Sequence, residues 1–173
     1  MFGPVSMGRL NLVQPTLKEI MIVLESQMSE SIGITQGVRT DPEQAALWAQ
    51  GRIPVDQVNA LRKALGWAPI DVSDNVIVTK AKPGYSWHSF GMAVDVVPFD
   101  SQQHPDWNEN HPVWQEIVTK GEALGLVSGI SFEDTPHFQL TGRFPVTPDD
   151  EVRALAQTGG MQAVWQAANI QAR

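Results

Sequence analysis

Apolar residues recur at helical spacing in several stretches of the chain. The first such stretch, 15–30, opens with a proline suited to a first helical turn and carries Leu17, Ile20, Met21, Leu24 and Met28. The stretch 40–51 predicts a second helix, which Asp41 can cap and Gly51 can stop. The same spacing predicts further helices within 54–66 and 111–125.

Other stretches alternate between apolar and polar residues, as strands do. The run 32–38 places Ile32, Ile34, Gln36 and Val38 on one side and predicts a strand that delivers Arg39 at its end. A strand is also predicted for 75–79, followed by a turn at 82–84, and short strands are expected near 126–129 and 138–140. Mixed helices and short strands of this kind predict an α+β fold with a small, mostly antiparallel sheet flanked by helices.

The length of the chain favours one domain. With 173 residues and 42% hydrophobic content it can bury one ordinary core. We expect a single catalytic domain over 1–173, with its core at about 15–145. The acidic residues at 149–151 suit a helix N-terminus, so helices at about 147–169 are expected to pack on that core.

Charge and cysteine content narrow the possible partners and metal ligands. The net charge of -7 disfavours nucleic acid and anionic membranes, and no apolar run approaches the ~20 residues that span a bilayer. The chain has no cysteine, so a metal would be held by His, Asp or Glu. The first fifteen residues lack the basic and apolar parts of a signal peptide, which predicts synthesis into a cytoplasm. We also expect a monomer.

The stretch YSWHSFGMAVDVVPFD, at 85–100, places two candidate metal ligands seven residues apart. One regular strand would send His88 and Asp95 to opposite faces, because strands alternate with period two. A bend near 89–91 that aims His88 inward, followed by a strand over 92–97, makes the two side chains converge. The stretch therefore predicts two ligands at one point.

The stretch FEDTPHFQL, at 132–140, supplies a third candidate ligand. A strand that begins near Pro136 directs His137 to the same side as Gln139, away from the core. His88, Asp95 and His137 would leave Zn²⁺ an open position for water, as catalytic zinc sites do. Asp134, three residues before His137, suits a general base. The alternative is that each is a polar residue at a strand end, satisfied by backbone groups.

These motifs resemble a family of zinc peptidases. SWHSFGMAVD followed by DTPHF is similar to the peptidases that cut peptidoglycan stem peptides, namely D-alanyl-D-alanine carboxypeptidases and dipeptidases and the L-alanyl-D-glutamate endopeptidases of bacteriophage endolysins. The upstream stretch GVRTDPEQAALWAQGR resembles the second signature of the family, and the likeness covers roughly 15–145. The chain departs from endolysin relatives before DTPHF, where Ser128 and Ser131 replace a usual Gly-Gly and tryptophan.

The resemblance implies a role for each of the motif residues. His88, Asp95 and His137 would be zinc ligands, and Asp134 would be the catalytic carboxylate, as in the endolysin branch. Arg39 would contact the substrate and its oxyanion, while Ser86 and Gln44 would contact the substrate. Each of these three also has a purely local interpretation: a surface ion pair for Arg39, closure of the turn for Ser86, and an N3 helix cap for Gln44.

Taken together, the sequence predicts zinc-dependent hydrolysis of a peptidoglycan stem peptide. The favoured bond is L-alanyl-D-glutamate, cut by a phage or prophage endolysin that stays in the host cytoplasm until its release to the cell wall. D-Alanyl-D-alanine carboxypeptidase or dipeptidase activity is the alternative within the family. A non-haem Fe(II) oxygenase and a non-catalytic zinc-binding module are the alternatives outside it.

Overall fold

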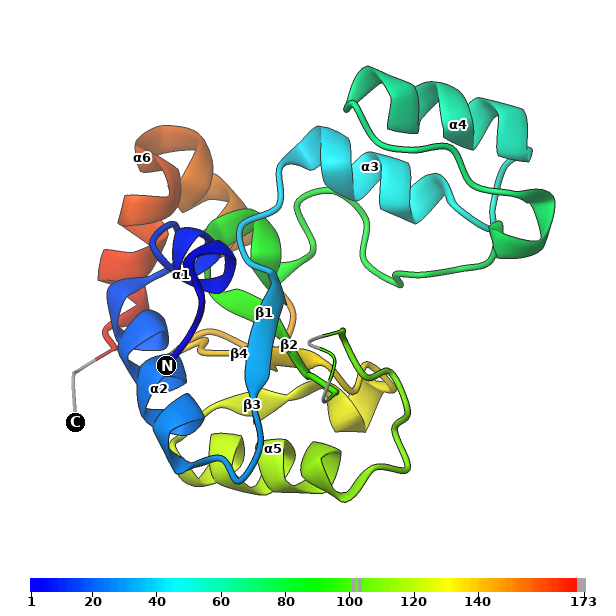
Figure 1. Ribbon diagram of the computed structural model, residues 1–173. Helices are drawn as coiled ribbons and strands as arrows, with labels where there is room; N and C mark the ends of the chain where they lie inside the picture. The colour runs from blue at the N-terminus through cyan, green and yellow to red at the C-terminus, as the bar shows by residue number, and fades with distance from the viewer. Residues whose placement is uncertain (101, 103, 171–173) are drawn as a thin grey trace.

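The structure of the protein, a computed structural model, is built on a four-stranded sheet with strand order β1-β2-β4-β3 (Figure 1). It describes residues 1–100, 102 and 104–170. The strands are β1 (Ile32–Gln36), β2 (Ala93–Pro98), β3 (Val127–Ser128) and β4 (His137–Gln139). Each pair of neighbouring strands is antiparallel, as the sequence predicts.

Helices pack around this sheet, and all of the described α-helices except the first lie within the stretches predicted to be helical. The α-helices of the described residues are α1 (Pro4–Leu10), α2 (Pro15–Gln27), α3 (Asp41–Ala49), α4 (Val55–Ala64), α5 (Pro112–Ala123) and α6 (Asp150–Ala168). Three short 3-10 helices are η1 (Val72–Asp74), η2 (Trp87–Phe90) and η3 (Gly129–Phe132). These residues include no helix that is long and apolar enough to cross a bilayer.

Two apolar clusters hold these elements together. The larger one lies between the sheet and helices α1, α2 and α5, and it includes Leu10, Leu24, Ile117 and Phe138. The smaller one joins η2 to α6 through buried side chains that include Trp87 and Val164. Burial of this apolar surface fixes the sheet on one side and η2 on the other.

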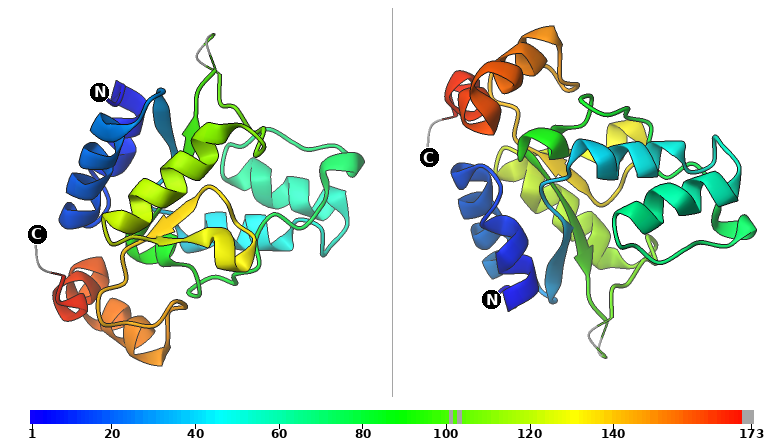
Figure 2. Two further views of the ribbon diagram at one scale, coloured as in Figure 1. Left: turned by 90° about the horizontal axis from the view of Figure 1, so that it is seen from below. Right: turned by 90° about the horizontal axis from the view of Figure 1, so that it is seen from above.

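Helices α3 and α4 form a lobe that projects from the rest of the molecule. Figures 1 and 2 show the lobe on one side of the sheet and helices α1, α2 and α6 on the opposite side. A long connection, residues 65–86, returns from α4 to η2 and completes the lobe. Arg39 lies at the junction, between β1 and α3.

The structure corrects three of the local predictions. Residues 75–79 form no strand, and Val76, Ile77 and Val78 are 50–57% exposed, because the run finds no strand to pair with in the described chain. The cap of α3 is Thr40, which forms a capping box with Glu43. The core begins before residue 15, because Leu10 of α1 is fully buried. Helix α1 itself was not predicted. The C-terminal element α6 is interrupted at Gly160, whose backbone is non-helical (φ 65°, ψ -165°), so it consists of two helical parts, in agreement with the expected helices at about 147–169.

Candidate active site

The register of the sheet brings Asp95 and His137 side by side. Asp95 on β2 lies directly opposite His137 on β4, so both side chains leave the same face of the sheet. Oδ1 of Asp95 lies 3.4 Å from Nδ1 of His137. Two residues far apart in sequence therefore reach one point through a single strand pairing.

His88 reaches the same point from the 3-10 helix η2. Ser86 caps this helix, and Gly91 ends it in the left-handed region, at φ 64°, and turns the chain into β2. Nε2 of His88 lies 3.1 Å from Oδ1 of Asp95 and 3.2 Å from Nδ1 of His137. The predicted bend near 89–91 is thus present, as a helical turn, and it aims His88 inward.

Hydrogen bonds on the far side of each imidazole decide which nitrogen faces the site. Nδ1 of His88 lies 2.8 Å from the carbonyl oxygen of Gly37, which only accepts, so Nδ1 carries the proton of the neutral ring. Nε2 of His137 lies 2.9 Å from Oε1 of Gln139 and carries its proton for the same reason. In the neutral rings, Nε2 of His88 and Nδ1 of His137 therefore present lone pairs to each other and to Asp95.

This donor set fits a metal ion. The three ligand atoms of His88, Asp95 and His137 lie within 4.8 Å of one another, and two imidazoles with a carboxylate are ligands that zinc accepts. The pKa values of His137 and Asp95 both favour the charged form of each side chain. Burial alone would lower the pKa of His137, but its hydrogen bond to Asp95 and the charge of that carboxylate raise it. The pKa of Asp95 is lowered, because the attraction of the two imidazoles outweighs its own desolvation.

Arg39 lies against the outer oxygen of the same carboxylate. Its Nη2 is 3.5 Å from Oδ2 of Asp95, and its backbone N–H donates to the carbonyl of His88. Arg39 is 8% exposed and lines the cavity described below, so it is not the surface ion pair of the local interpretation. Its burial lowers the pKa of the guanidinium, and the charge of Asp95 offsets part of that effect.

Gln44 lies behind Arg39 and not on the cavity wall. Its side chain is fully buried, Oε1 accepts from Nη1 of Arg39 at 2.9 Å, and Nε2 donates to the carbonyl of Ala81 at 2.7 Å. The N3 capping role belongs to its neighbour Glu43. Any influence of Gln44 on a substrate is therefore indirect, through Arg39 or through Ala81, which lines the cavity.

Asp134 lies on the cavity wall beside the three ligand residues. Its backbone is held by two bonds: its N–H donates to the carbonyl of Gly129, and its carbonyl accepts from the N–H of His137. A Cβ on Gly129 would lie 2.0 Å from the Asp134 oxygen, so this close approach requires glycine. Desolvation by the wall and the charge of Asp95 raise the pKa of Asp134, which favours a proton acceptor that works near neutral pH.

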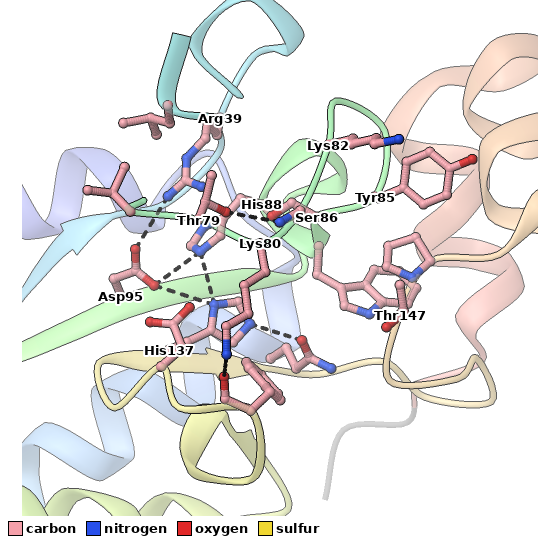
Figure 3. Close-up of a pocket in the computed structure, with 18 of the residues that line it drawn as sticks. Arg39, Thr79, Lys80, Lys82, Tyr85, Ser86, His88, Asp95, His137 and Thr147 are labelled. Carbon is pink, nitrogen blue, oxygen red and sulfur yellow. Dashed lines mark hydrogen bonds and ion pairs between the residues drawn. The ribbon is translucent and has the colours of Figure 1, made fainter. Parts of the chain in front are cut away.

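A cavity of about 950 Å³ opens above the ligands. Figure 3 shows His88, Asp95 and His137 clustered at one end with Arg39 beside them, while Lys82, Tyr85 and Thr147 lie toward the other end. The cavity is within the size range of small-molecule sites, about 300–1,000 Å³. Ser86 also lines it, and its hydroxyl accepts from the N–H of His88 at 3.4 Å, so it closes the turn and faces the cavity at once.

Comparison with known proteins connects this geometry to a family. Residues 79–140 match a family model described as D-alanyl-D-alanine carboxypeptidase. The matched residues include the three ligand residues, Ser86 and Asp134, whereas Arg39 and Gln44 lie outside the match. The segment that holds the candidate metal ligands is thus similar to this peptidase family. We refer to residues 79–140 as the peptidase segment.

The peptidase segment identifies the chain as a peptidase. Peptidases of this family use zinc, and His88, Asp95 and His137 are positioned to bind that ion. The structure also resembles the crystal structure of the L-Ala D-Glu endopeptidase ChiX of Serratia marcescens, with 19% sequence identity and a TM-score of 0.48. That alignment covers 83% of this chain and 92% of the other.

Two groups near the peptidase segment's ligands were not predicted as functional. Gln139 was predicted to face the same side as His137, but nothing in the sequence indicated that its amide would bond the imidazole. Lys80 lines the cavity, where its Nζ contacts the carboxylate of Glu133 and the carbonyl of Phe132. The sequence did not indicate this contact, because a strand predicted at 75–79 would have put the preceding residues in the sheet and not on the cavity wall.

Proposed function

We propose that the protein hydrolyses the L-alanyl-D-glutamate bond of peptidoglycan stem peptides with zinc held by His88, Asp95 and His137. One observation carries the proposal: two imidazole lone pairs and a carboxylate converge in a large cavity, with Asp134 on its wall. The aspartate version of the base is the one that the endolysin branch uses, which favours this bond within the family. The description of the matching family favours D-alanyl-D-alanine cleavage, which is the second candidate.

Asp134 has the properties of the proton carrier in this reaction. Zinc, when bound, supplies a Lewis acid that makes an attacking water acidic enough to lose a proton near neutral pH. Asp134 accepts that proton, and its raised pKa brings it closer to the working pH. The same carboxyl group then donates the proton to the departing amine, so it returns to its starting state.

Arg39 has the properties of the group that stabilises the oxyanion. It is a buried cation on the cavity wall, where a hydrogen bond to a developing negative charge is stronger than in water. Its bonds to Gln44 and Asp95 hold the guanidinium in place before the substrate arrives. Such a donor typically contributes about 2.7 to 4 kcal/mol to the transition state.

Digestion of defined muropeptides, together with metal analysis of the protein, tests the proposal. A disaccharide pentapeptide cut between L-alanine and D-glutamate releases a peptide that begins with D-glutamate, whereas D-alanyl-D-alanine cleavage releases free D-alanine. Mass spectrometry separates the two products. Asp134→Asn is the matched control, because it preserves the size of the side chain and removes the base.

The same measurements distinguish the remaining alternatives. Bound iron with oxygen uptake and no hydrolysis would assign the chain to the oxygenases, which share the two-histidine, one-carboxylate ligand set. Bound zinc with no turnover on any stem peptide would assign a structural metal module. Release of D-alanine alone would replace the proposed bond by the second candidate.

The proposed biological role is that of an endolysin kept from the wall by the membrane. Bacteria that express the protein in the cytoplasm are then expected to stay intact until the membrane is permeabilised, and to lyse afterwards. Cells with Asp134→Asn should remain intact after the same treatment. Lysis without permeabilisation, or none after it, contradicts this role and leaves the peptidase activity to be judged by the muropeptide digestion.

A further inference from the structure

A buried glutamine connects the metal site to the C-terminal part of the chain. Gln139 is 2% exposed, and its Oε1 accepts from Nε2 of His137 at 2.9 Å. Its Nε2 donates to the backbone carbonyl of Val146 at 2.8 Å. The contact with Val146 determines the orientation of the Gln139 amide. A carbonyl only accepts, so the amide nitrogen faces Val146 and the amide oxygen faces the imidazole.

The carbonyl of Val146 also holds the neighbour of the second imidazole ligand. Nε1 of Trp87 donates to it at 2.7 Å, and Trp87 directly precedes His88 in η2. One backbone oxygen thus accepts from both ligand-bearing segments. Val146 lies beyond the peptidase segment, in the connection that leads to the Asp149 cap of α6.

Helix α6 has a second attachment to the same 3-10 helix. Nε1 of Trp165 donates to the carbonyl of Phe90 at 2.7 Å, and Val152, Val164 and Ala168 pack in the apolar cluster with Trp87. The segment 144–168 is therefore tied to η2 by two indole hydrogen bonds and by apolar packing. Through Gln139 it is also tied to His137.

We infer that Gln139 is a positioning residue that holds His137 in the tautomer with Nδ1 free for the metal, and that it couples metal binding to the docking of residues 144–168. The inference rests on the metal site of the proposed function and not on which bond is cut. The other tautomer would place a proton on Nδ1, where it blocks the ligand atom. It would also leave Nε2 and Oε1 facing each other as two acceptors, which is unfavourable in a buried site.

Two substitutions at Gln139 separate tautomer control from simple packing. Gln139→Met keeps the volume and removes the strong acceptor, whereas Gln139→Glu keeps an acceptor toward His137. We expect zinc affinity, measured by competition with a chromophoric chelator, to fall about 10- to 100-fold in the Met variant, the range typical of such partners. In the Glu variant it should fall less than in the Met variant, because an acceptor still faces Nε2 of the imidazole, although the hydrogen bond to the carbonyl of Val146 is lost.

The metal-free protein gives a readout that packing alone would not change. The ¹⁵N chemical shifts of the two His137 ring nitrogens, recorded at a pH where the ring is neutral, report which one carries the proton, and we expect Nε2–H in the wild type and Gln139→Glu, and a mixture in Gln139→Met. Gln50→Met is the matched control. Gln50 is a buried glutamine that donates to the carbonyl of Asp74 at 2.9 Å, remote from the ligands, so its variant should keep wild-type zinc affinity.

Hydrogen exchange tests the coupling to the C-terminal segment. If docking of α6 supports zinc binding, zinc must support docking to the same extent, because coupling between sites is reciprocal. Zinc should therefore slow amide exchange within 150–168 in the wild type, and less so in Gln139→Met. If the rate of amide exchange within 150–168 is the same with and without zinc in the wild type, the proposed coupling is wrong.

The remaining outcomes also decide between the claims. Wild-type zinc affinity in Gln139→Met, or an equal loss in the Glu and Met variants, would overturn tautomer control. An equal loss in Gln50→Met would assign the effect to general destabilisation and would overturn it as well. Wild-type protein that binds no zinc would overturn the proposed function together with this inference, so the two failures are distinguishable.

Discussion

The floor of the cavity and its rim are built in opposite ways. On the floor, His88 and His137 are 2% and 6% exposed, and each imidazole is fixed by a hydrogen bond on its far side. On the rim, Lys80 forms an ion pair with Glu133, and the two side chains are 68% and 86% exposed. The rim also exposes the apolar residues at 76–78, which pack in no strand.

From this contrast we expect the floor to hold the groups that carry chemistry and the rim to hold groups that only border the cavity. The floor residues sit on paired strands and a capped 3-10 helix, so their positions are set before a substrate binds. The rim belongs to connections between elements, and an exposed ion pair contributes only about 0–1 kcal/mol. The floor should therefore tolerate little change, while the rim should tolerate much. The following experiments test this contrast, from the largest expected effect to the smallest.

Removal of the metal should abolish hydrolysis altogether. The ligand residues bring together donors for an ion, and Asp134 has no sufficiently acidic water to deprotonate without it. We expect a chelator to stop stem-peptide cleavage and added Zn²⁺ to restore it. Full activity in excess chelator, with absence of metal verified by mass spectrometry, would contradict metal-dependent catalysis by the residues on the floor.

Asp134→Asn should slow catalysis by about 10² to 10⁴ while zinc stays bound. The amide can still form hydrogen bonds, but it cannot take a proton at neutral pH. Asp95→Asn is its counterpart, because it removes a charged ligand and should mainly weaken zinc binding. Zinc content and kcat measured for both variants assign base and ligand. Loss of zinc in the first and wild-type affinity in the second would mean that the two roles are exchanged.

Arg39→Ala should lower kcat by about 10² to 10³, the usual effect of losing one oxyanion donor. Zinc affinity should change little, because the contact between Arg39 and Asp95 is long, at 3.5 Å. Zinc affinity and kcat are measured together for the variant. If zinc affinity falls as far as kcat does, Arg39 acts by orienting Asp95 and not by binding the oxyanion.

Lys80→Met on the rim should have the smallest effect. Because the ion pair is exposed, the free energy of unfolding should change by no more than about 0.5 kcal/mol. We expect kcat within about threefold of wild type, with any change appearing in KM, since the residue lines the cavity without touching the ligands. Steady-state kinetics and urea unfolding measure both. A loss of kcat similar to that of Asp134→Asn would place Lys80 in the chemistry and would erase the distinction between floor and rim.

The identities of the ligand residues could be predicted from the sequence, but the atoms that they present could not. Period-two alternation and the spacing around Gly91 were enough to bring His88, Asp95 and His137 together. Which nitrogen of each ring faces the site depends on Gly37 and Gln139, whose contacts arise from the register of the sheet. The hydrophobic pattern of one segment cannot predict a contact with another segment of the chain.

The failures at 75–79 and in α1 have a different physical origin. A β-branched run becomes a strand only where a neighbour offers a free edge, and strand propensity does not report on that neighbour. Helix α1 is short, and its stability comes from packing Leu10 into the core more than from its own sequence. Both depend on tertiary contacts that single-sequence patterns do not contain.

The pairing of β2 with β4 has a consequence for how the chain acquires its activity during folding. Asp95 and His137 become neighbours only when this long-range pairing forms, and contacts of high sequence separation are typically late and slow. The complete ligand set is therefore absent from early, partly folded states, which hold isolated histidines of low metal affinity. We expect zinc to act mainly on the rate of unfolding and hardly on the rate of folding, so that the loaded enzyme gains kinetic persistence.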